Sequence, residues 1–188
     1  MEAIVLVEPE IPENTGFIAR LADNYGAELR VVNPGFQLEE ARKTATNAQQ
    51  KLRDTKIYST VDAAVEGLDQ VVGTKPGRGL PVKGFEPREN TSVMIGRESS
   101  GLSNEELGKC DAVVHIDVPG YSSLNQSHAT AILLHELSSS SSRSLKEDQK
   151  KTLESFVGEG KVEELILRGS PTRKEFDRLM GELKDLVD

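Results

Sequence analysis

Short apolar stretches alternate with amphipathic ones through most of this 188-residue chain. Runs rich in β-branched residues predict buried strands, and apolar positions repeating every three or four residues predict helices packed by one face. The predicted strands cover residues 4–7, 29–32, 56–58, 70–73, 93–95 and 113–118, and the predicted helices cover residues 15–24, 39–51, 61–66, 124–137 and a segment from Asn104. This alternation indicates an α/β fold with a parallel sheet and helices on both faces. General rules of chain connection favour an unknotted, doubly wound arrangement.

The first strand-to-helix junction lies in residues 8–26. Asn14 is a good N-cap residue for the predicted helix, and Gly26 is a typical helix stop. Gly16 in the first turn permits close approach of another backbone or a ligand. Arg20 falls two positions from an apolar stripe residue, so we expect it to project away from the core.

The second junction follows the strand at residues 93–95. Gly96, Arg97 and Glu98 turn out of this strand, and Ser103 with Glu106 has the pattern of a capping box that opens a helix. A carboxylate in a glycine-flanked loop has little value for packing, so Glu98 is a candidate functional residue.

The third junction, after residues 113–118, is bent by Pro119 and Gly120. Ser123 and Gln126 have capping-box spacing, which predicts a helix with Leu124 at its first position. Ligands of open α/β sheets bind where strand carboxyl ends meet helix amino ends, and residues 121–125 occupy such a place.

The carboxyl-terminal part begins with a serine run at residues 138–142, which predicts a mobile linker. Beyond it, apolar residues mark three short helical stripes that are too small to form a core alone. We expect them to pack on the main domain or on a second subunit, and a contact with a substrate molecule is an alternative.

Composition narrows the class of protein. The length suits one domain plus an appendage, and 36% apolar residues can build one core. The single Cys110 excludes an internal disulfide and favours a reducing, cytoplasmic location. No leader and no long apolar run is present, so secretion and membrane insertion are not expected. The three histidines show no metal-ligand grouping with the cysteine, so we expect no metal.

The net charge of −8 argues against a general nucleic-acid binder, which usually has a basic face. Basic residues nevertheless gather near the junctions, at Arg20, Lys75, Arg78, Lys83 and Arg97. A local patch of this kind can bind phosphates while an acidic remainder keeps the protein soluble.

The three junctions, in this order, resemble the three sequence motifs of the SPOUT class of RNA methyltransferases. The matching segments are NTGFIAR at residues 14–20, GRESSGL at residues 96–102, and residues 116–125 ending in SLN. The resemblance covers roughly residues 1–141 and is strongest to the branch that methylates ribose 2′-oxygens in the tRNA anticodon loop.

This resemblance implies a fold and an activity. The fold is a parallel-sheet α/β-knot domain over residues 1–141 with a trefoil knot near its carboxyl end, followed by a linker and helical extension over residues 142–188. The activity is methylation of a ribose 2′-hydroxyl by S-adenosylmethionine, with tRNA nucleotide 32 as the expected target. The wobble nucleotide of tRNA and rRNA are alternatives. The protein is expected to be a homodimer in which Arg20 acts on the partner's site.

The resemblance also implies roles for individual residues. The expected catalytic residues are Arg20, Glu98 and Asn125. The expected cofactor-binding residues are Thr74, Lys75, Pro76, Gly96, Ile116, Ser122, Ser123 and Leu124, and the expected RNA contacts are Asn14, Arg20, Arg78, Arg97 and Ser127. We expect Arg20 to hold a phosphate and stabilise developing alkoxide, because a guanidinium is a poor base. Loop bracing without chemistry is an equal alternative for Glu98 and Asn125.

Two other classes of function are alternatives for this chain. A dinucleotide-binding oxidoreductase is disfavoured, because residues 8–16 read EPEIPENTG and contain no G-x-G-x-x-G after the first strand. A catalytically idle RNA-binding relative that acts in RNA assembly is the second alternative. The presence of Arg20, Glu98 and Asn125 together argues against it.

Overall fold

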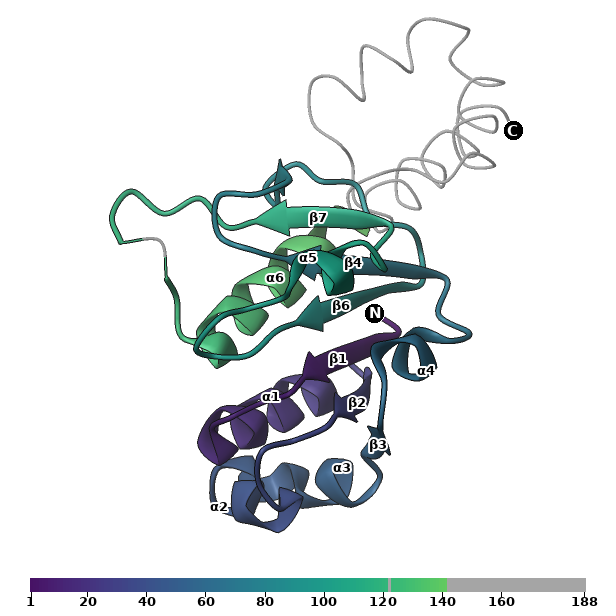
Figure 1. Ribbon diagram of the computed structural model, residues 1–188, viewed down its shortest axis with the longest axis vertical. Coiled ribbons are helices and arrows are strands. Elements are labelled where there is room, and N and C mark those ends of the chain that lie inside the picture. Colours follow the sequence, from purple (N-terminus) through teal and green to yellow (C-terminus); the bar gives the residue numbers. More distant parts are fainter. Residues whose placement is uncertain (122, 142–188) are drawn as a thin grey trace, which may run out of the picture. The chain divides into compact units, whose positions relative to one another are not determined.

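Seven parallel strands form one sheet in a computed structural model that describes residues 1–121 and 123–141. The strands are β1 (Ala3–Val7), β2 (Glu28–Val32), β3 (Lys56–Tyr58), β4 (Gln70–Thr74), β5 (Leu80–Pro81), β6 (Thr91–Ile95) and β7 (Ala112–His115). Their order is β3-β2-β1-β6-β4-β7-β5, and every neighbouring pair is parallel (Figure 1). The parallel α/β sheet predicted from the sequence is therefore confirmed.

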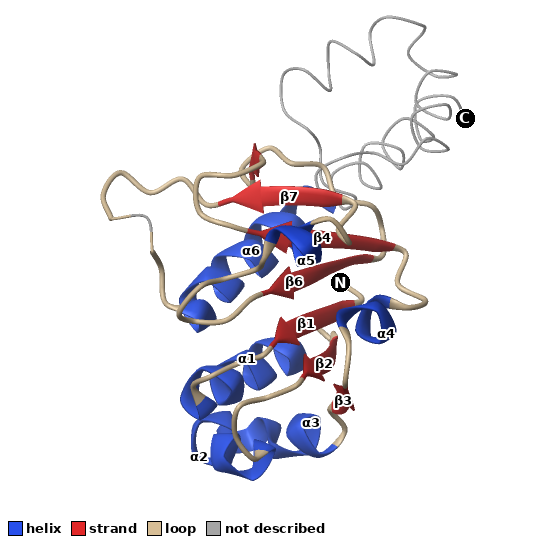
Figure 2. Ribbon diagram, in the orientation of Figure 1, coloured by secondary structure: helices blue, strands red, loops and turns tan. Residues whose placement is uncertain are grey.

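The helices are divided between the two faces of the sheet (Figure 2). Side chains from α1 (Pro12–Asn24), α2 (Arg42–Ala45), α3 (Gln49–Arg53) and α6 (Gln126–Ser141) share one apolar cluster with the sheet. Side chains from α4 (Val61–Val65) and α5 (Asn104–Leu107) share the other. Two single-turn 3₁₀ segments, Leu38–Ala41 and Thr46–Ala48, flank α2.

Strand β1 shows why the sheet lies at the centre of the unit formed by residues 1–138. All five of its residues are buried; Ile4 and Leu6 belong to one apolar cluster, whereas Val5 and Val7 belong to the other. A parallel sheet covered on both faces requires such continuously apolar strands.

The strand order changes direction at the centre of the sheet. Strands β1 and β6 are paired, but β1 leads through α1 to β2 on one side and β6 leads through α5 to β7 on the other. The connections that follow the two strands therefore run in opposite directions, and open α/β sheets bind ligands at such a switch point. Strand order does not record how the chain threads, so the trefoil knot stays a prediction.

Two of the predicted helices on the amino-terminal side of the chain have different boundaries in the structure. Helix α1 begins at Pro12 with Ile11 as its N-cap, because proline at the first helical position needs no backbone donor; Asn14 lies inside the helix. The segment predicted as one helix over residues 39–51 is broken at Thr46, where φ is 46°. Its buried positions Ala41, Ala45, Ala48 and Leu52 keep the spacing of one continuous helix, so the pattern does not reveal this break.

The third junction differs most. Strand β7 ends at His115, and α6 begins at Gln126, so the predicted Ser123–Gln126 capping box does not form. Asn125 replaces it, because its Oδ1 accepts hydrogen bonds from the backbone N–H groups of Ser127 at 2.9 Å and His128 at 3.4 Å.

The serine run at residues 138–142 also differs from its prediction as a linker. Helix α6 continues through Ser141, so residues 138–141 are helical and do not form the expected linker. The apolar anchors Leu133, Leu134 and Leu137 hold the preceding turns, and serine is a tolerated helix residue. The helical stripes of residues 142–188 lie outside the described residues, and the domain boundary at residue 141 stays a prediction.

Candidate active site

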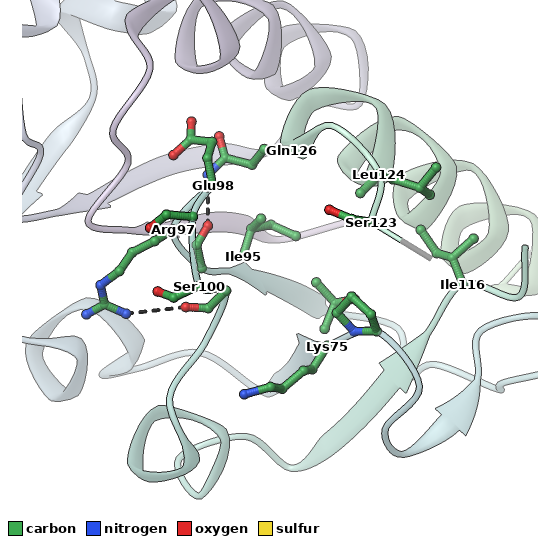
Figure 3. A pocket seen from close by; sticks show the side chains of 15 residues that line it. Lys75, Ile95, Arg97, Glu98, Ser100, Ile116, Ser123, Leu124 and Gln126 are labelled. Carbon is green, nitrogen blue, oxygen red and sulfur yellow. Dashed lines mark hydrogen bonds between the residues drawn. The ribbon is translucent and has the colours of Figure 1, made fainter. Parts of the chain in front are cut away.

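A pocket of about 340 Å³ lies at the carboxyl ends of β4, β6 and β7. Three loops and the start of α6 enclose it (Figure 3). We call it the loop pocket; its lining residues are Thr74, Lys75, Pro76, Ile95, Gly96, Arg97, Glu98, Ser99, Ser100, Gly101, Ile116, Ser123, Leu124, Gln126 and Ala129. Ligand pockets typically measure about 300–1,000 Å³, so this one suits a small molecule.

The turn after β6 is tight because it contains Gly96. A Cβ atom placed on Gly96 would lie 2.2 Å from the carbonyl carbon of Gly101, which is far inside van der Waals contact. Gly101 has a φ of 67°, and its backbone N–H donates to the Arg97 carbonyl at 2.9 Å. Only glycine allows the two strands of this turn to approach so closely.

Arg97 in the same turn forms ion pairs with two carboxylates of this chain. Its guanidinium forms a bidentate pair with Glu106 at 2.9 and 3.1 Å, and it also contacts Glu8 at 2.9 Å. Hydrogen bonding to Glu106 raises the pKa of Arg97. Burial opposes ionisation of Glu106, yet the Arg97 guanidinium holds the pKa of that carboxyl below its ordinary value. These contacts favour a bracing role for Arg97 over the RNA contact that we expected.

Glu98 and Asn125 are joined through Asn14, so one amide links all three predicted motifs. Asn14 Nδ2 donates to Glu98 Oε1 at 3.1 Å, and Asn14 Oδ1 accepts from Asn125 Nδ2 at 3.0 Å. Asn125 Oδ1 also accepts from the Ser127 hydroxyl at 2.7 Å. Asn14 is only 4% exposed, which favours bracing over the RNA contact that we expected for it.

Glu98 also substitutes for the missing N-cap side chain of α1. Its two carboxylate oxygens accept from the backbone N–H groups of Glu10 at 2.8 Å and Ile11 at 3.3 Å. These donors lie just before α1, where a carboxylate is favoured by the helix dipole. No contact between Glu98 and Arg20 occurs among the hydrogen bonds and ion pairs of residues 1–121 and 123–141.

Lys75 and Gln126 hold the loop pocket from opposite sides. Lys75 Nζ donates to the Leu102 carbonyl at 2.8 Å. Gln126 Nε2 donates to the Gly96 carbonyl at 2.8 Å, so the start of α6 is tied to the turn after β6 (Figure 3).

A second hollow, of about 270 Å³, lies between α1 and α6. We call it the helix groove; it is lined by Phe17, Arg20, Leu21, Asn24, Ser127, His128 and Ala131. Arg20 is exposed, and within the described part of the chain no hydrogen bond or ion pair engages its guanidinium. The Arg20 guanidinium is therefore available for a contact beyond the described residues.

Comparison with known proteins agrees with this geometry. The family model described as the SpoU rRNA Methylase family matches residues 1–135. The chain belongs to this family. It is 36% identical over 154 residues to a tRNA (cytidine-2′-O-)-methyltransferase TrmJ of Methanocaldococcus jannaschii, an alignment that covers 73% of this chain and 67% of that protein. The matched region spans about two thirds or less of the curated relatives.

Solved structures of SpoU-type proteins have the same fold. One, described as giving structural insights into the 2-OH methylation of C/U34 on tRNA, is 27% identical with a TM-score of 0.68 and covers 74% of this chain and 95% of its own. Another is the SpoU methyltransferase AviRb from Streptomyces viridochromogenes in complex with the cofactor AdoMet, at 25% identity and a TM-score of 0.64; the match covers 72% of this chain and 56% of that one. The resemblance to methyltransferases of this class is confirmed.

In this SpoU-family chain the predicted site residues fall into two places. Seven of the expected cofactor-binding residues line the loop pocket: Thr74, Lys75, Pro76, Gly96, Ile116, Ser123 and Leu124. Ser122 lies outside the described residues. Glu98 and Arg97 line the loop pocket as well, and Asn125 braces the chain beside it. Arg20 and Ser127 line the helix groove, and Arg78 lies on an exposed loop where it donates to Asn104.

Sequence reasoning missed four contributors: Glu8, Glu10, Glu106 and Gln126. Glu10 accepts from the Ser99 hydroxyl and backbone, and the hydroxyl contact lowers the pKa of this exposed carboxyl. Glu106 and Gln126 were noticed only as capping partners. Their tertiary contacts, to Arg97 and Gly96, join positions whose pairing no local pattern encodes.

Two further properties concern the described residues only. They contain no group of three or more His, Cys, Asp or Glu side chains that could hold a metal ion. None of their helices is long and apolar enough to cross a membrane.

Proposed function

We propose that the protein transfers a methyl group from S-adenosylmethionine to a ribose 2′-hydroxyl in the anticodon loop of tRNA. The observation that carries this proposal is the loop pocket, where the second and third motif segments meet at the carboxyl ends of β6 and β7. Family membership and relatives named as tRNA 2′-O-methyltransferases support the same activity.

The loop pocket fits an adenosine cofactor. Its volume suits a ligand of this class, and Gly96 leaves the backbone accessible where a side chain would clash. The apolar residues Pro76, Ile116 and Leu124 supply surface for a purine ring, and Gln126 adds a buried amide. Bound AdoMet in the related AviRb structure supports the assignment.

The cofactor supplies a methyl group on a sulfonium, so the protein has no leaving group to activate. The task of the chain is to align the acceptor hydroxyl and to help remove its proton. Arg20 holds the neighbouring phosphate and stabilises the negative charge that develops on the ribose oxygen. A guanidinium is a poor base, so phosphate or water takes the proton. Glu98 and Asn125 keep the loops in place through Asn14.

We also propose that the active form is a homodimer in which the partner's Arg20 completes each site. Arg20 lines the helix groove and is not among the residues of the loop pocket. Near the groove, α1 and α6 carry exposed apolar side chains, with Phe17 43% and Ile132 37% exposed. A two-fold contact between these helices would cover them and place identical patches together.

Mixing two inactive variants tests the dimer. Arg20→Ala chains keep the loop pocket, and Leu124→Trp chains keep Arg20. In an equal mixture that pairs at random, half of the dimers contain one chain of each variant. Each mixed dimer has one complete site out of two, and the other dimers have none. About a quarter of the wild-type activity should therefore return. Failure of the mixture to recover activity, or a monomer by light scattering at micromolar concentration, contradicts the proposal.

Nucleotide 32 is the proposed target, with the wobble nucleotide and rRNA as alternatives. The structure described for C/U34 favours nucleotide 34 as the rival, and the family description favours rRNA. The test uses tRNA transcripts with a 2′-deoxyribose at nucleotide 32 or at nucleotide 34, plus rRNA. Loss of methyl incorporation only with the first transcript supports nucleotide 32, and loss only with the second overturns it. Methylation of rRNA alone overturns tRNA as the substrate.

A further inference from the structure

Gln126 combines deep burial with an unused hydrogen-bond acceptor. Its side chain is 6% exposed, and its Oε1 has no hydrogen-bond partner among the described residues. Burying an amide oxygen without a partner is unfavourable, and such atoms are rare in folded proteins. The same side chain lines the loop pocket, so the unused acceptor lies where a ligand would bind.

The orientation of this amide is fixed by its other half. Gln126 Nε2 donates to the Gly96 carbonyl at 2.8 Å, and a carbonyl accepts only from the nitrogen side of an amide. Flipping the amide would direct two acceptors at each other. Oε1 is thereby held in place as an acceptor, and its missing partner must be a donor.

The position of Gln126 within the loop pocket limits which group of a ligand can donate to its Oε1. Gln126 is bonded to Gly96 in the turn after β6, whereas Leu124 and Ile116 come from the loop after β7 and are drawn away from Gln126 in Figure 3. The flat purine suits the apolar end, which leaves the ribose for the end formed by Gly96 and Gln126. An ammonium group would favour a carboxylate over a neutral amide oxygen.

We propose that Gln126 Oε1 accepts a hydrogen bond from a ribose hydroxyl of the bound cofactor. This inference rests on the proposed function, because it requires S-adenosylmethionine in the loop pocket. Gln126 then binds the cofactor directly, through a hydrogen bond to its ribose. It also couples that contact to the turn after β6, through the bond from Nε2 to Gly96.

The test measures binding by calorimetry of S-adenosylhomocysteine and of analogues that lack the 2′-hydroxyl, the 3′-hydroxyl or the adenine amino group. Against the wild-type protein, removing the hydroxyl that Gln126 reads should weaken binding by roughly 5- to 100-fold, the range for leaving a buried acceptor unpaired. In Gln126→Met, which has a side chain of similar length without an acceptor, S-adenosylhomocysteine should bind more weakly. The same deoxy analogue should then show no further penalty.

Gln70→Met is the matched control. Gln70 is also a buried glutamine, 7% exposed, but its Oε1 already accepts from Arg88 N–H and the Thr91 hydroxyl at the amino end of β4. This variant should lose stability and keep both the affinity and the deoxy penalty. If Gln126→Met does not fold, Gln126→Asn replaces it, since the shorter amide withdraws the oxygen from the pocket.

The outcomes separate this inference from the proposed function. A deoxy penalty that persists in the Gln126 variant overturns the inference while the cofactor assignment stands. The inference is also overturned if the Gln126 variant loses only the affinity penalty of the analogue that lacks the adenine amino group. Gln126 would then contact the base and not the ribose. A wild-type protein that binds no S-adenosylhomocysteine overturns the proposed function together with the inference.

Discussion

The loop pocket and the helix groove both include residues of α6, but they are held in different ways. Around the loop pocket, the side chains of Arg97, Glu98, Lys75 and Gln126 each have a hydrogen-bond partner elsewhere in the described part of the chain. In the helix groove, the Arg20 guanidinium has no hydrogen-bond or ion-pair partner among the described residues, and Phe17, which lines the same groove, is 43% exposed.

This difference separates two tasks within the proposed reaction. A small cofactor requires a preformed cavity, so the chain fixes that cavity with its own hydrogen bonds. RNA is large and arrives from outside, so the residue proposed to grip it stays available on the surface. Under the proposed function, one chain contains the whole cofactor pocket but needs Arg20 of a second chain for its acceptor site.

The largest effect is expected in the loop pocket itself. Leu124→Trp should place an indole ring in the cavity and weaken S-adenosylhomocysteine binding by on the order of 1000-fold, about 4 kcal/mol. Leu80→Trp is the control, because Leu80 is 58% exposed on the edge strand β5. The measurement is calorimetry with circular dichroism to verify folding. Unchanged affinity in a folded Leu124→Trp protein would remove Leu124 from the site.

A slightly smaller loss is expected at Arg20, and it should appear in rate alone. Arg20→Lys and Arg20→Ala should slow methylation roughly 30- to 1000-fold, because a point charge cannot reproduce a planar fork; this corresponds to about 2–4 kcal/mol. Cofactor affinity should not change, since Arg20 does not line the loop pocket. Arg53→Ala, an exposed change on α3, is the control.

Single-turnover methylation of tRNA measures this effect, with calorimetry beside it. If both Arg20 variants react at the wild-type rate, Arg20 is an ordinary surface residue. The difference between the loop pocket and the helix groove would then be unrelated to catalysis.

A moderate loss of stability is expected from removing the Asn14 amide. Asn14→Ala leaves Asn125 Nδ2 and part of Glu98 without their partner, which should cost about 1–3 kcal/mol of unfolding free energy. Asn47→Ala, an exposed change, should cost little. Denaturant unfolding measures both. An Asn14→Ala protein as stable as the wild type would show that the three motifs are held together by other contacts.

The smallest effect concerns the Arg97–Glu106 pair and depends on pH. The pKa of Glu106 lies below its ordinary value of 4.5 in the folded protein, so its ionisation stabilises the fold above that value and is lost as pH falls through the lowered pKa. Glu106→Gln should therefore lower stability near neutral pH by about 1 kcal/mol or less. The deficit should shrink as the pH falls through the lowered pKa of Glu106.

Thermal unfolding of the wild type and of Glu106→Gln across this pH range provides the measurement. Glu105→Gln, an exposed change in the same helical turn, is the control. A deficit that grows as the pH falls would contradict the assigned ionic contact.

The sequence predicted the elements well where local chemistry decides them. Strand β1 is apolar at all five positions, and α5 has the Ser103–Glu106 capping box that was expected. Predictions were wrong where a distant residue decides the boundary. Helix α1 is capped by Glu98 from a loop 87 positions away, and α6 starts at Gln126 because Asn125 is held by Asn14 and caps it.

The candidate site shows the same division. Seven expected residues share the loop pocket because the carboxyl ends of parallel strands meet at one edge, which topology fixes. The contacts that brace the pocket could not be predicted, because pairing Arg97 with Glu8 or Gln126 with Gly96 requires the sheet order. Residue type alone had suggested RNA contacts for Asn14 and Arg97, whereas the burial of Asn14 and the ion pairs of Arg97 favour bracing.

The Asn14 amide has a consequence for how the protein folds. It joins Glu98 at a separation of 84 positions and Asn125 at a separation of 111, so the contacts around the loop pocket are among the most distant in the chain. Closing such long loops is entropically costly, and chains dominated by distant contacts fold slowly. The pocket should therefore be completed late, after α6 has docked. A ligand that binds in the loop pocket would therefore bind only the fully folded protein and would stabilise it against unfolding.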